Sequence, residues 1–351
     1  MVRHRKLINK LFAYLLLSIL SGMMVLPLVW MLATSFKTSS VVFSFPPRWL
    51  PTEPVVTEMN GQTYPVYSYH GKQVVVIRHT PQGDVIQSVG EKKEEIISRG
   101  AYGHTPLQPM ERVVFHWRNY IEAWKAVNIP EAFGGLLKNA DGFLVFYLNS
   151  LMVSIAITAG TVFTSSLAAF AFARLRFRGR DQVFLGYLAT LMVPAVVTMI
   201  PLFCLFRIFR LTDSYAALIL PGLFSAYGTF MLRQFFISLP KELEEAAIID
   251  GCTSWQIYWR IVIPLSKPAL ATLGIFTFLH SWNEFMWPLI VINRLALKTL
   301  PIGLSYFQDS YSTDWHLLMA GSVITLLPVL IVFLLGQRFF IKGIVLSGIK
   351  G

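Results

Sequence analysis

Two ionisable side chains, His280 and Glu284, lie in an otherwise uncharged and largely apolar stretch of the sequence. Their separation by four residues places them on one face of a helix. Ionisable groups are costly inside hydrocarbon, so this pair is a candidate for a solute path or a proton relay. Asn283 is a candidate for the same solute path. A plainer alternative for Glu284 is a position near the external end of its helix, where it needs only a partner or water.

Few other residues are arranged to perform chemistry. The sequence contains no G-x4-G-K-[ST] run, the loop that cradles nucleotide phosphates. The seven histidines are scattered without the spacing of a metal site, and no arrangement of nucleophile and base stands out. Two cysteines, Cys204 and Cys252, are too few for a disulfide framework. We therefore predict that the protein is not an enzyme and that it binds no cofactor or metal itself.

The composition places most of the chain in a membrane. Of its 351 residues 54% are hydrophobic and 14% are charged, whereas soluble domains have about 25% charged residues. Strands of a membrane barrel are short and alternate in polarity, whereas here the apolar stretches reach the roughly 20 residues of a spanning helix. We therefore predict an all-α polytopic membrane protein. Its six transmembrane helices are expected at Ala13–Thr34, Phe143–Phe172, Val183–Phe206, Ser214–Leu232, Ala269–Asn293 and Leu317–Gln337.

Basic residues indicate the orientation of these helices. They gather before the first stretch, between the second and third, and after the sixth, at Arg3, Arg5, Lys6, Lys10, Arg174, Arg176, Arg178, Arg180, Arg338, Lys342 and Lys350. Six crossings place all three segments on one side, which the positive-inside rule makes the cytoplasm. Both termini are therefore predicted to be cytoplasmic, with Arg207 and Arg210 as exceptions on the other side. The net charge of +11 is then a topology signal, and we expect no nucleic-acid partner.

The first apolar stretch could instead belong to a signal peptide, since basic residues precede it. However, it is longer than the apolar core of a signal peptide, which has about 7–15 residues. We therefore favour a retained helix.

A large segment between the first two helices is predicted to be external. Three strand-like runs, Tyr64–Tyr69, Val74–Ile77 and Asp84–Val89, are separated by turn residues at 70–72 and 81–84. They predict a small antiparallel meander, which is marginally stable alone and should pack on something. We favour an insertion that packs on the protein's own helices over a contact for an external solute-binding protein.

The expected domains follow from these boundaries. They are the N-terminus with the first helix (1–36), the external, partly β insert (37–142), a core of helices two to six (143–337) with a cytoplasmic loop at 233–268, and a cytoplasmic tail (338–351).

The cytoplasmic loop 233–268 contains signals for two short helices. Ser238 can cap the first, with Pro240 in its first turn and Glu242, Glu244 and Glu245 near the positive end of the helix dipole. Asp250-Gly251 should end it, because glycine adopts the left-handed conformation without steric cost. Ser254 can cap a second helix that runs through Ile263, and Pro264 and Pro268 then lead into the fifth membrane helix.

This loop has the composition of a docking surface. Ala246 and Ala247 permit close backbone approach, and an apolar, aromatic surface is expected from Ile248, Ile249, Trp255, Tyr258, Trp259 and Ile261. Such a loop predicts a knob that fills a groove on a partner protein. The alternative is a loop that packs on its own membrane domain. A DNA-reading helix–turn–helix is disfavoured, because acidic residues at its start would repel phosphates.

The run Glu245-Ala246-Ala247-x3-Gly251-x9-Ile261-x-Ile263-Pro264 resembles the EAA motif of binding-protein-dependent ABC importer permeases. Ile263 stands where that family usually has leucine. Further residues resemble the carbohydrate-uptake branch and its MalG-like second permease. They are Asp250-Gly251, Arg260, Pro264-Leu265-x2-Pro268, Asn119-Tyr120 with Trp124, Asn149-Ser150, Trp282-Asn283-Glu284-Phe285 and the closing Gly348–Gly351. The external insert is much longer than is usual for this subunit.

The resemblance implies a permease subunit of an ATP-driven importer in the cell inner membrane, with an oligosaccharide or disaccharide as its solute. The residues that it assigns to coupling with an ATPase are Glu245, Ala246, Ala247, Asp250, Gly251, Ile261 and Pro264, with a tail contact at Lys350 and Gly351. It also implies four kinds of partner: a second homologous permease, an ABC ATPase dimer that holds ATP and Mg, an external or periplasmic solute-binding protein, and membrane lipid. The alternative function is a proton-coupled secondary transporter that uses His280 and Glu284 and needs no ATPase.

Overall fold

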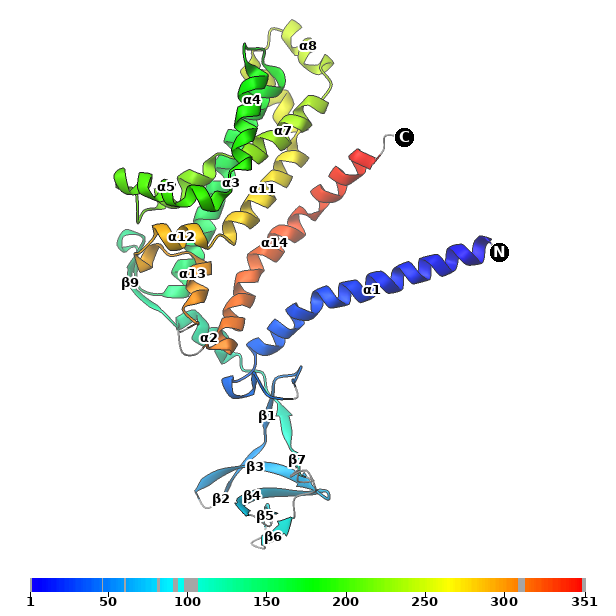
Figure 1. Ribbon diagram of the computed structural model, residues 1–351, viewed down its shortest axis with the longest axis vertical. Coiled ribbons are helices and arrows are strands. Elements are labelled where there is room, and N and C mark those ends of the chain that lie inside the picture. The colour runs from blue at the N-terminus through cyan, green and yellow to red at the C-terminus, as the bar shows by residue number, and fades with distance from the viewer. Residues whose placement is uncertain are drawn as a thin grey trace. The chain divides into compact units, whose positions relative to one another are not determined.

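The computed structural model describes residues 2–45, 47–59, 61–80, 83–90, 94–97, 107–308 and 313–348. The chain forms two compact units. The first unit comprises Met1–Ala123 with Ser310–Val323, and the second comprises Trp124–Asp309 with Ile324–Gly351. Figure 1 labels their helices and strands.

The first unit begins with a long apolar helix, α1 (Val2–Ser35). Residues Asn9–Ser35 are long and apolar enough to cross a membrane. The helix ends where Asn119, on the short helix α2 (Arg118–Lys125), donates its side-chain amide to the carbonyls of Ser35 and Lys37, at 2.8 Å each. The Ser35 and Tyr120 hydroxyls lie 2.7 Å apart. Asn119 thus satisfies the carbonyl of the last residue of α1 and that of Lys37 just beyond it, while Tyr120 contacts the Ser35 hydroxyl.

The segment between α1 and α2 folds as a small antiparallel sheet. Its strands lie in the order β2 (Val56–Met59), β3 (Gln62–Tyr69), β4 (Lys72–Thr80), β5 (Gly83–Ser88) and β6 (Glu94–Ile97), and β7 (Gln108–Pro109) pairs with β3. The three strands predicted from the sequence are therefore present. Val74, Ile86 and Ile97 form a core of their own for this sheet. At the tip between β3 and β4, His70 and Gly71 both have positive φ, the geometry of a tight hairpin turn.

Two further strands connect this sheet to the rest of the first unit. β1 (Thr52–Pro54) and β8 (Glu111–Val113) pair antiparallel, so the chain enters and leaves the sheet side by side. Ion pairs join Arg48 to Glu111 at 2.5 Å and His116 to Glu53 at 2.7 Å.

The second unit is built around one long helix, α3 (Gly142–Arg174). A hairpin of β9 (Asn128–Ala132) and β10 (Leu137–Asp141) precedes it. Helices α7 (Ala226–Ser238) and α11 (Lys267–Trp282) pack on α3. Beyond α11 the chain forms α12 (Met286–Val291), the 3-10 turn η6 (Leu295–Leu297), α13 (Leu300–Ser305) and the final helix α14 (Trp315–Gly348).

Three of the six expected membrane helices are interrupted. The stretch Val183–Phe206 divides into α4 (Arg180–Ala189), the turn η3 (Thr190–Met192) and α5 (Ala195–Ile208), which bend by 99°. The cause is Pro194, which has no N–H to donate and holds Val193 in an extended conformation. Four described helices are long and apolar enough to span, or up to six if each bent pair counts as one span. The predicted number of six thus depends on counting bent pairs.

The stretch Ser214–Leu232 is the second interrupted one. It contains α6 (Tyr215–Ile219), the turn η4 (Leu220–Leu223) and α7. Two hydroxyls of α3 satisfy the carbonyls that this break leaves free. Thr161 donates to the carbonyl of Gly222 at 2.6 Å, and Thr164 donates to that of Leu223 at 2.5 Å. Such breaks are tolerated in membranes only when the freed backbone groups find partners.

The stretch Ala269–Asn293 is the third, because α11 ends at Trp282 instead of continuing. Asn283 donates its side-chain amide back to the carbonyl of Leu279 at 2.7 Å, and the Glu284 carboxylate accepts the backbone N–H of Trp287 at 3.1 Å. The two side chains thereby close α11 and begin α12. Local capping by Asn and Glu ended a helix that apolarity alone predicted to be continuous.

Asn149 on α3 fixes the segment that leads into α13. Its fully buried amide donates to the carbonyls of Ala296 (3.0 Å) and Lys298 (2.9 Å), and its oxygen accepts the Tyr215 hydroxyl at 2.7 Å.

We predict that Asn149→Ala lowers the free energy of unfolding by about 2–3 kcal/mol, because it leaves buried carbonyls without donors. Thermal unfolding of the detergent-solubilised protein measures this. Asn293→Ala is the control, with an expected change of about 0.5 kcal/mol or less, since its side chain is exposed. Equal melting of both variants would contradict the assignment.

Candidate coupling surface

The first loop helix is α8 (Glu242–Ile249), and its N-terminus differs from the prediction. Ser238 does not cap it, because α7 extends through Ser238 and the serine hydroxyl donates to the Phe235 carbonyl. Leu239 is extended and Pro240 follows, so the helix starts after Lys241 without a side-chain cap. Glu242, Glu244 and Glu245 do occupy the first turn, where their charge favours the helix dipole.

The C-terminus of α8 is formed as predicted. Asp250 follows the last helical residue, and Gly251 has φ +81°, the left-handed conformation. The N–H of Cys252 bonds to the carbonyl of Ala247, and the N–H of Gly251 bonds to that of Ile248. These two bonds satisfy carbonyls that the helix itself leaves unpaired.

The second loop helix begins one residue earlier than predicted. Its cap is Thr253 instead of Ser254, because Thr253 and Gln256 form a reciprocal capping box. The chain continues as α9 (Ser254–Ile257), a π-helical turn η5 (Tyr258–Val262) and α10 (Ile263–Leu265). The predicted second helix through Ile263 is therefore present, but it contains a π-helical turn and continues to Leu265. Pro264 has no N–H for the carbonyl four residues earlier, so the turn before it widens.

One side of this loop packs on the membrane helices. Ala247, Ile257, Tyr258 and Val262 are buried in a single cluster with residues of α3, α7 and α11, namely Ala169, Phe170, Leu232, Phe236 and Leu273. The Tyr258 hydroxyl lies 2.7 Å from that of Ser166 on α3. Tyr258 was expected on the exposed surface, and that prediction was wrong.

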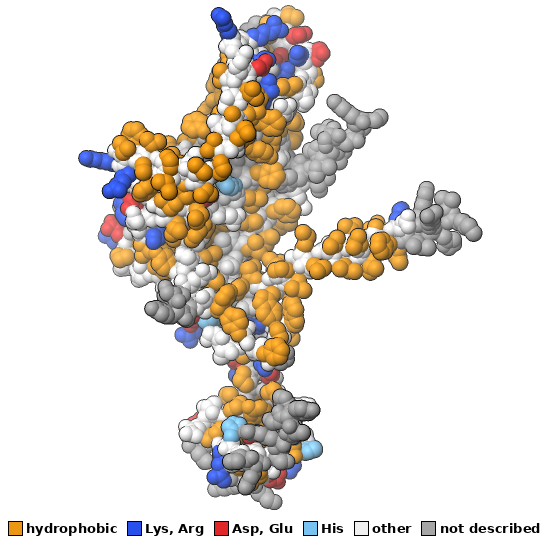
Figure 2. Space-filling model, in the orientation of Figure 1, with side chains coloured by type: hydrophobic (Ala, Val, Ile, Leu, Met, Phe, Trp, Pro, Cys, Tyr) orange, Lys and Arg blue, Asp and Glu red, His pale blue; other side chains and the backbone are white. Residues whose placement is uncertain are grey.

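The other side presents apolar side chains to solvent. Ile249 is 86% exposed, Ile248 60%, Trp255 56%, Leu243 45% and Trp259 44%. We name these five residues the coupling face; apolar and acidic side chains lie together around α8 in Figure 2. The buried Tyr258 ring supports both tryptophans, with ring centroids 5.5 Å from Trp255 and 5.0 Å from Trp259. Exposed apolar residues of this kind are typical of surfaces that contact a partner protein or a membrane.

The predicted coupling residues divide between the two sides. Glu245, Ala246, Asp250, Gly251 and Pro264 are exposed. Ala247 is buried, and Ile261 is half-buried against the same cluster. The predicted tail contact at Lys350 and Gly351 lies outside the described residues.

A cavity of about 550 Å³ lies between α3, α5, η4 and α11 of the second unit. His280 and Glu284 both line it, with His280 Nε2 3.9 Å from a Glu284 carboxylate oxygen, too long for a hydrogen bond. Asn283 is not part of the lining. The remaining wall is mostly apolar with some hydroxyls, and includes Thr161, Thr198, Ser225, Thr277, Ser281, Leu202, Phe276 and Trp287.

Sequence reasoning missed Arg174. It was counted only as part of the basic cluster that sets orientation, yet its side chain is 4% exposed and forms an ion pair with Glu244 at 2.9 Å. A cue was present in its position, since it stands directly at the end of an uncharged stretch.

Comparison with known proteins assigns the chain to a family, and the matched region contains the loop 233–268. The family described as "Binding-protein-dependent transport system inner membrane component" matches residues 144–345. The chain belongs to this family. It is therefore a multi-pass inner-membrane transport subunit without an ATPase site of its own. The family match supports an ABC importer and gives no support to the alternative of a proton-coupled secondary transporter.

Several curated relatives are similar over most of their length. The arabinooligosaccharides transport system permease protein AraQ of Bacillus subtilis is 41% identical over 216 residues, 62% of this chain and 77% of the relative. The probable ABC transporter permease protein YurM of the same organism is 37% identical over 241 residues, 68% of this chain and 75% of the relative. The sn-glycerol-3-phosphate transport system permease protein UgpE of Yersinia pestis is 38% identical over 231 residues, 65% of this chain and 79% of the relative.

A solved structure shares the fold. A chain of a bacterial ABC transporter involved in the import of the acidic polysaccharide alginate superimposes with a TM-score of 0.67 at 19% identity. The match covers 95% of this chain and 96% of that chain.

Gly251 provides a test of the local geometry of the loop. We predict that Gly251→Ala destabilises the protein by about 1–2 kcal/mol, because a side chain disfavours the left-handed backbone. A Cβ at this position would meet no atom within 4 Å, so the cost is conformational alone. Gly251→Asn should cost less, since asparagine tolerates this conformation. Gly186→Ala, in the open middle of α4, is the control and should melt at or above the wild-type temperature. Equal melting temperatures for all three variants would contradict the prediction.

Proposed function

We propose that this chain is a permease subunit of an ATP-driven ABC importer for sugars, and that its coupling face docks in a cleft of a cytoplasmic ATPase. The observation that carries the docking is the two-sided loop. One side is fixed to α3, α7 and α11, while the other exposes apolar side chains beside Glu245 and Asp250. A loop that packed only on its own membrane domain would bury these residues. The ATP and Mg would be held by the partner ATPase dimer.

The proposed topology has six spans and cytoplasmic termini, with the bent pair α4–α5 counted as one span and α11 as another, while Ser254–Leu265 stays in the cytoplasmic loop. α8 and α4 lie at the end of the second unit where α3 finishes (Figure 1). Arg176 and Arg178, in the turn after α3, are exposed at this same end. The positive-inside rule then places the arginines and the coupling face together in the cytoplasm. The β insert connects α1 to the opposite end of α3, so it would be external.

The proposed solute class is carbohydrate. The relative AraQ, named for arabinooligosaccharides, is 41% identical, and UgpE, named for sn-glycerol-3-phosphate, is 38% identical. The first name favours an oligosaccharide, and the second names a different polar solute. The partners proposed with it are a second homologous permease, the ATPase dimer, an external solute-binding protein and membrane lipid. The Lys350-Gly351 tail is proposed as a further ATPase contact on the resemblance alone.

The cavity is proposed as part of the solute path. Its volume of about 550 Å³ lies within the range of small-molecule sites, and its wall offers hydroxyls, one carboxylate and one imidazole. Glu284 also has the structural role of accepting the Trp287 N–H at the start of α12. A functional test must therefore remove its charge and retain this hydrogen bond.

Docking of the coupling face is tested by co-purification. We predict that Trp255→Ala and Glu245→Lys each reduce the amount of ATPase that co-purifies with the tagged chain by about tenfold. Trp255 would become a buried aromatic anchor on docking, which contributes about 1–2 kcal/mol or more, and Glu245→Lys reverses the charge of a predicted contact residue. Trp117→Ala is the matched control, since Trp117 is 66% exposed but lies in the first unit outside the loop. Normal ATPase recovery with both loop variants, or an equal loss with Trp117→Ala, would overturn the docking assignment.

The solute path is tested by Glu284→Gln. Glutamine retains an oxygen for the Trp287 N–H, so α12 should remain capped while the charge is lost. We predict that uptake of radiolabelled arabinooligosaccharide by cells with the complete transporter falls by about tenfold or more, as expected when a polar contact to solute is removed. Uptake of sn-glycerol-3-phosphate, measured in parallel, distinguishes the two solute classes. Wild-type uptake by Glu284→Gln at every pH from 5 to 8 would remove both the solute-path and the proton-relay roles.

A further inference from the structure

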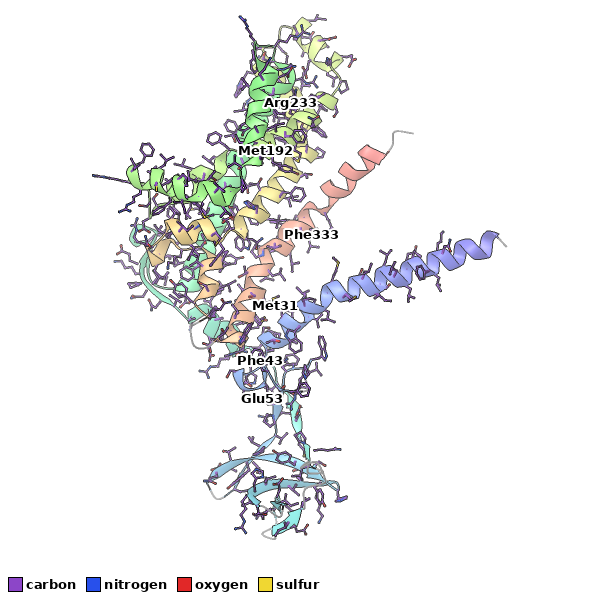
Figure 3. The ribbon with its side chains drawn as sticks, viewed as in Figure 1. Met31, Phe43, Glu53, Met192, Arg233 and Phe333 are labelled. Carbon is purple, nitrogen blue, oxygen red and sulfur yellow. The ribbon has the colours of Figure 1, made fainter. Side chains whose placement is uncertain are left out.

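At the end where the coupling loop begins, α3 and α7 each carry an arginine that donates hydrogen bonds to the other helix. Arg174, the last residue of α3, donates Nη2 hydrogens to the carbonyls of Phe236 and Leu239 at the end of α7, at 2.5 and 2.8 Å. Arg233 on α7, labelled in Figure 3, donates its Nε–H to the carbonyl of Phe172 on α3 at 3.3 Å. Each guanidinium thus satisfies backbone carbonyls at the end of the other helix. The two helix ends are joined by hydrogen bonds in both directions.

Each of these arginines also reaches a carboxylate on a third element. Arg174 pairs with Glu244 on α8, and the two side chains are only 4% and 16% exposed. Arg233 lies 3.5 Å from Asp181 on α4, but the Asp181 side chain is 68% exposed. Exposed ion pairs contribute little, whereas breaking a buried pair leaves a charge without compensation. Breaking the Arg174–Glu244 pair should therefore cost more free energy than breaking the Arg233–Asp181 pair.

The charge of Glu244 does not favour folding. Burial raises the pKa of its carboxyl group, and this outweighs the attraction of Arg174 and Lys241, which act in the opposite direction. A raised folded-state pKa means that the ionised form costs stability at neutral pH, a cost that is relieved as the pH falls through that pKa.

We propose that Arg174 and Glu244 form the link through which α8 moves α3 and α7 together, and that both act as positioning residues in energy coupling. One guanidinium belongs to α3, holds two carbonyls of α7 and pairs with a carboxylate of α8. A displacement of α8 must therefore carry Arg174 with it or break a buried ion pair. This inference rests on the proposed docking of the coupling face on an ATPase.

The neighbouring acidic residues provide a matched comparison. Glu242 lies in the same first turn of α8, but its side chain is exposed. It belongs neither to the coupling face nor to the predicted contact residues. Glu244→Ala and Glu242→Ala therefore remove the same charge from the same turn of one helix. Only the former breaks the contact with Arg174.

The test follows the motion of α5, which contributes Ala195, Thr198, Met199 and Leu202 to the cavity wall. Cys204 on α5 is exposed, so a fluorophore can be attached to it in a Cys252→Ser background, where it is the remaining cysteine of the chain. The complete complex, with its companion permease and ATPase, is then treated with ATP and vanadate. We expect a fluorescence change in the wild-type background and an equal one in Glu242→Ala. In Glu244→Ala the change should fall by about fivefold or more, while the ATPase still co-purifies.

A second variant tests the geometry of the guanidinium. Arg174→Lys keeps the positive charge, but its one ammonium nitrogen cannot occupy both the Nε position beside Glu244 and the Nη2 position beside the α7 carbonyls, so we expect a reduced fluorescence response here too. A full response in Arg174→Lys or in Glu244→Ala would overturn the proposal, as would an equal loss in Glu242→Ala. Failure of Glu244→Ala to capture the ATPase would also overturn it, because Glu244 would then belong to the docking contact. If the wild-type chain captures no ATPase, the proposed function fails instead.

Discussion

The second unit depends on one constraint, that a helix broken within a membrane must find partners for the backbone groups it frees. Helix α3 supplies many of them. From its beginning to its end its polar side chains reach neighbouring elements: Asn149 and Ser150 hold the segment before α13, Thr161 and Thr164 satisfy η4, and Arg174 holds the end of α7. A polar residue on α3 thus stands opposite each of these irregular segments, whereas the break after Trp282 is closed locally by Asn283 and Glu284.

This arrangement explains which features the sequence could predict. Length and apolarity depend on each stretch by itself, so they located the four stretches that are long and apolar enough to span, and the ends of α3 to within a few residues. Interruptions depend on partners far away in sequence. Ser214–Leu232 contains no charge, and Pro221 alone does not reveal that Thr161 and Thr164 would stabilise a break beside it. Periodicity and composition carry no information about such pairing.

In the coupling loop too, single residues with a local requirement were predicted correctly, whereas those that depend on a partner elsewhere were not. Gly251 was predicted correctly, because a left-handed residue at a helix end is a local requirement. The cap was predicted at Ser254 instead of Thr253, because both residue types can cap a helix and only the reciprocal bond of Gln256 decides between them. Tyr258 was predicted to belong to the exposed apolar, aromatic surface of the loop. The hydroxyl of Ser166 on α3 is what makes its burial possible.

The two adjacent alanines of α8 face opposite sides of the loop. Ala247 is buried against the cluster that joins α3, α7 and α11, while Ala246 is exposed on the side of Glu245. A larger side chain at Ala247 would displace α8 from its support, whereas one at Ala246 would hold a partner away. An eight-residue helix without a side-chain N-cap has little stability by itself. Its orientation therefore depends on Ala247, Tyr258 and the Arg174–Glu244 pair. Because these contacts attach it to three long helices at once, a force on the coupling face is borne by the helices that line the cavity.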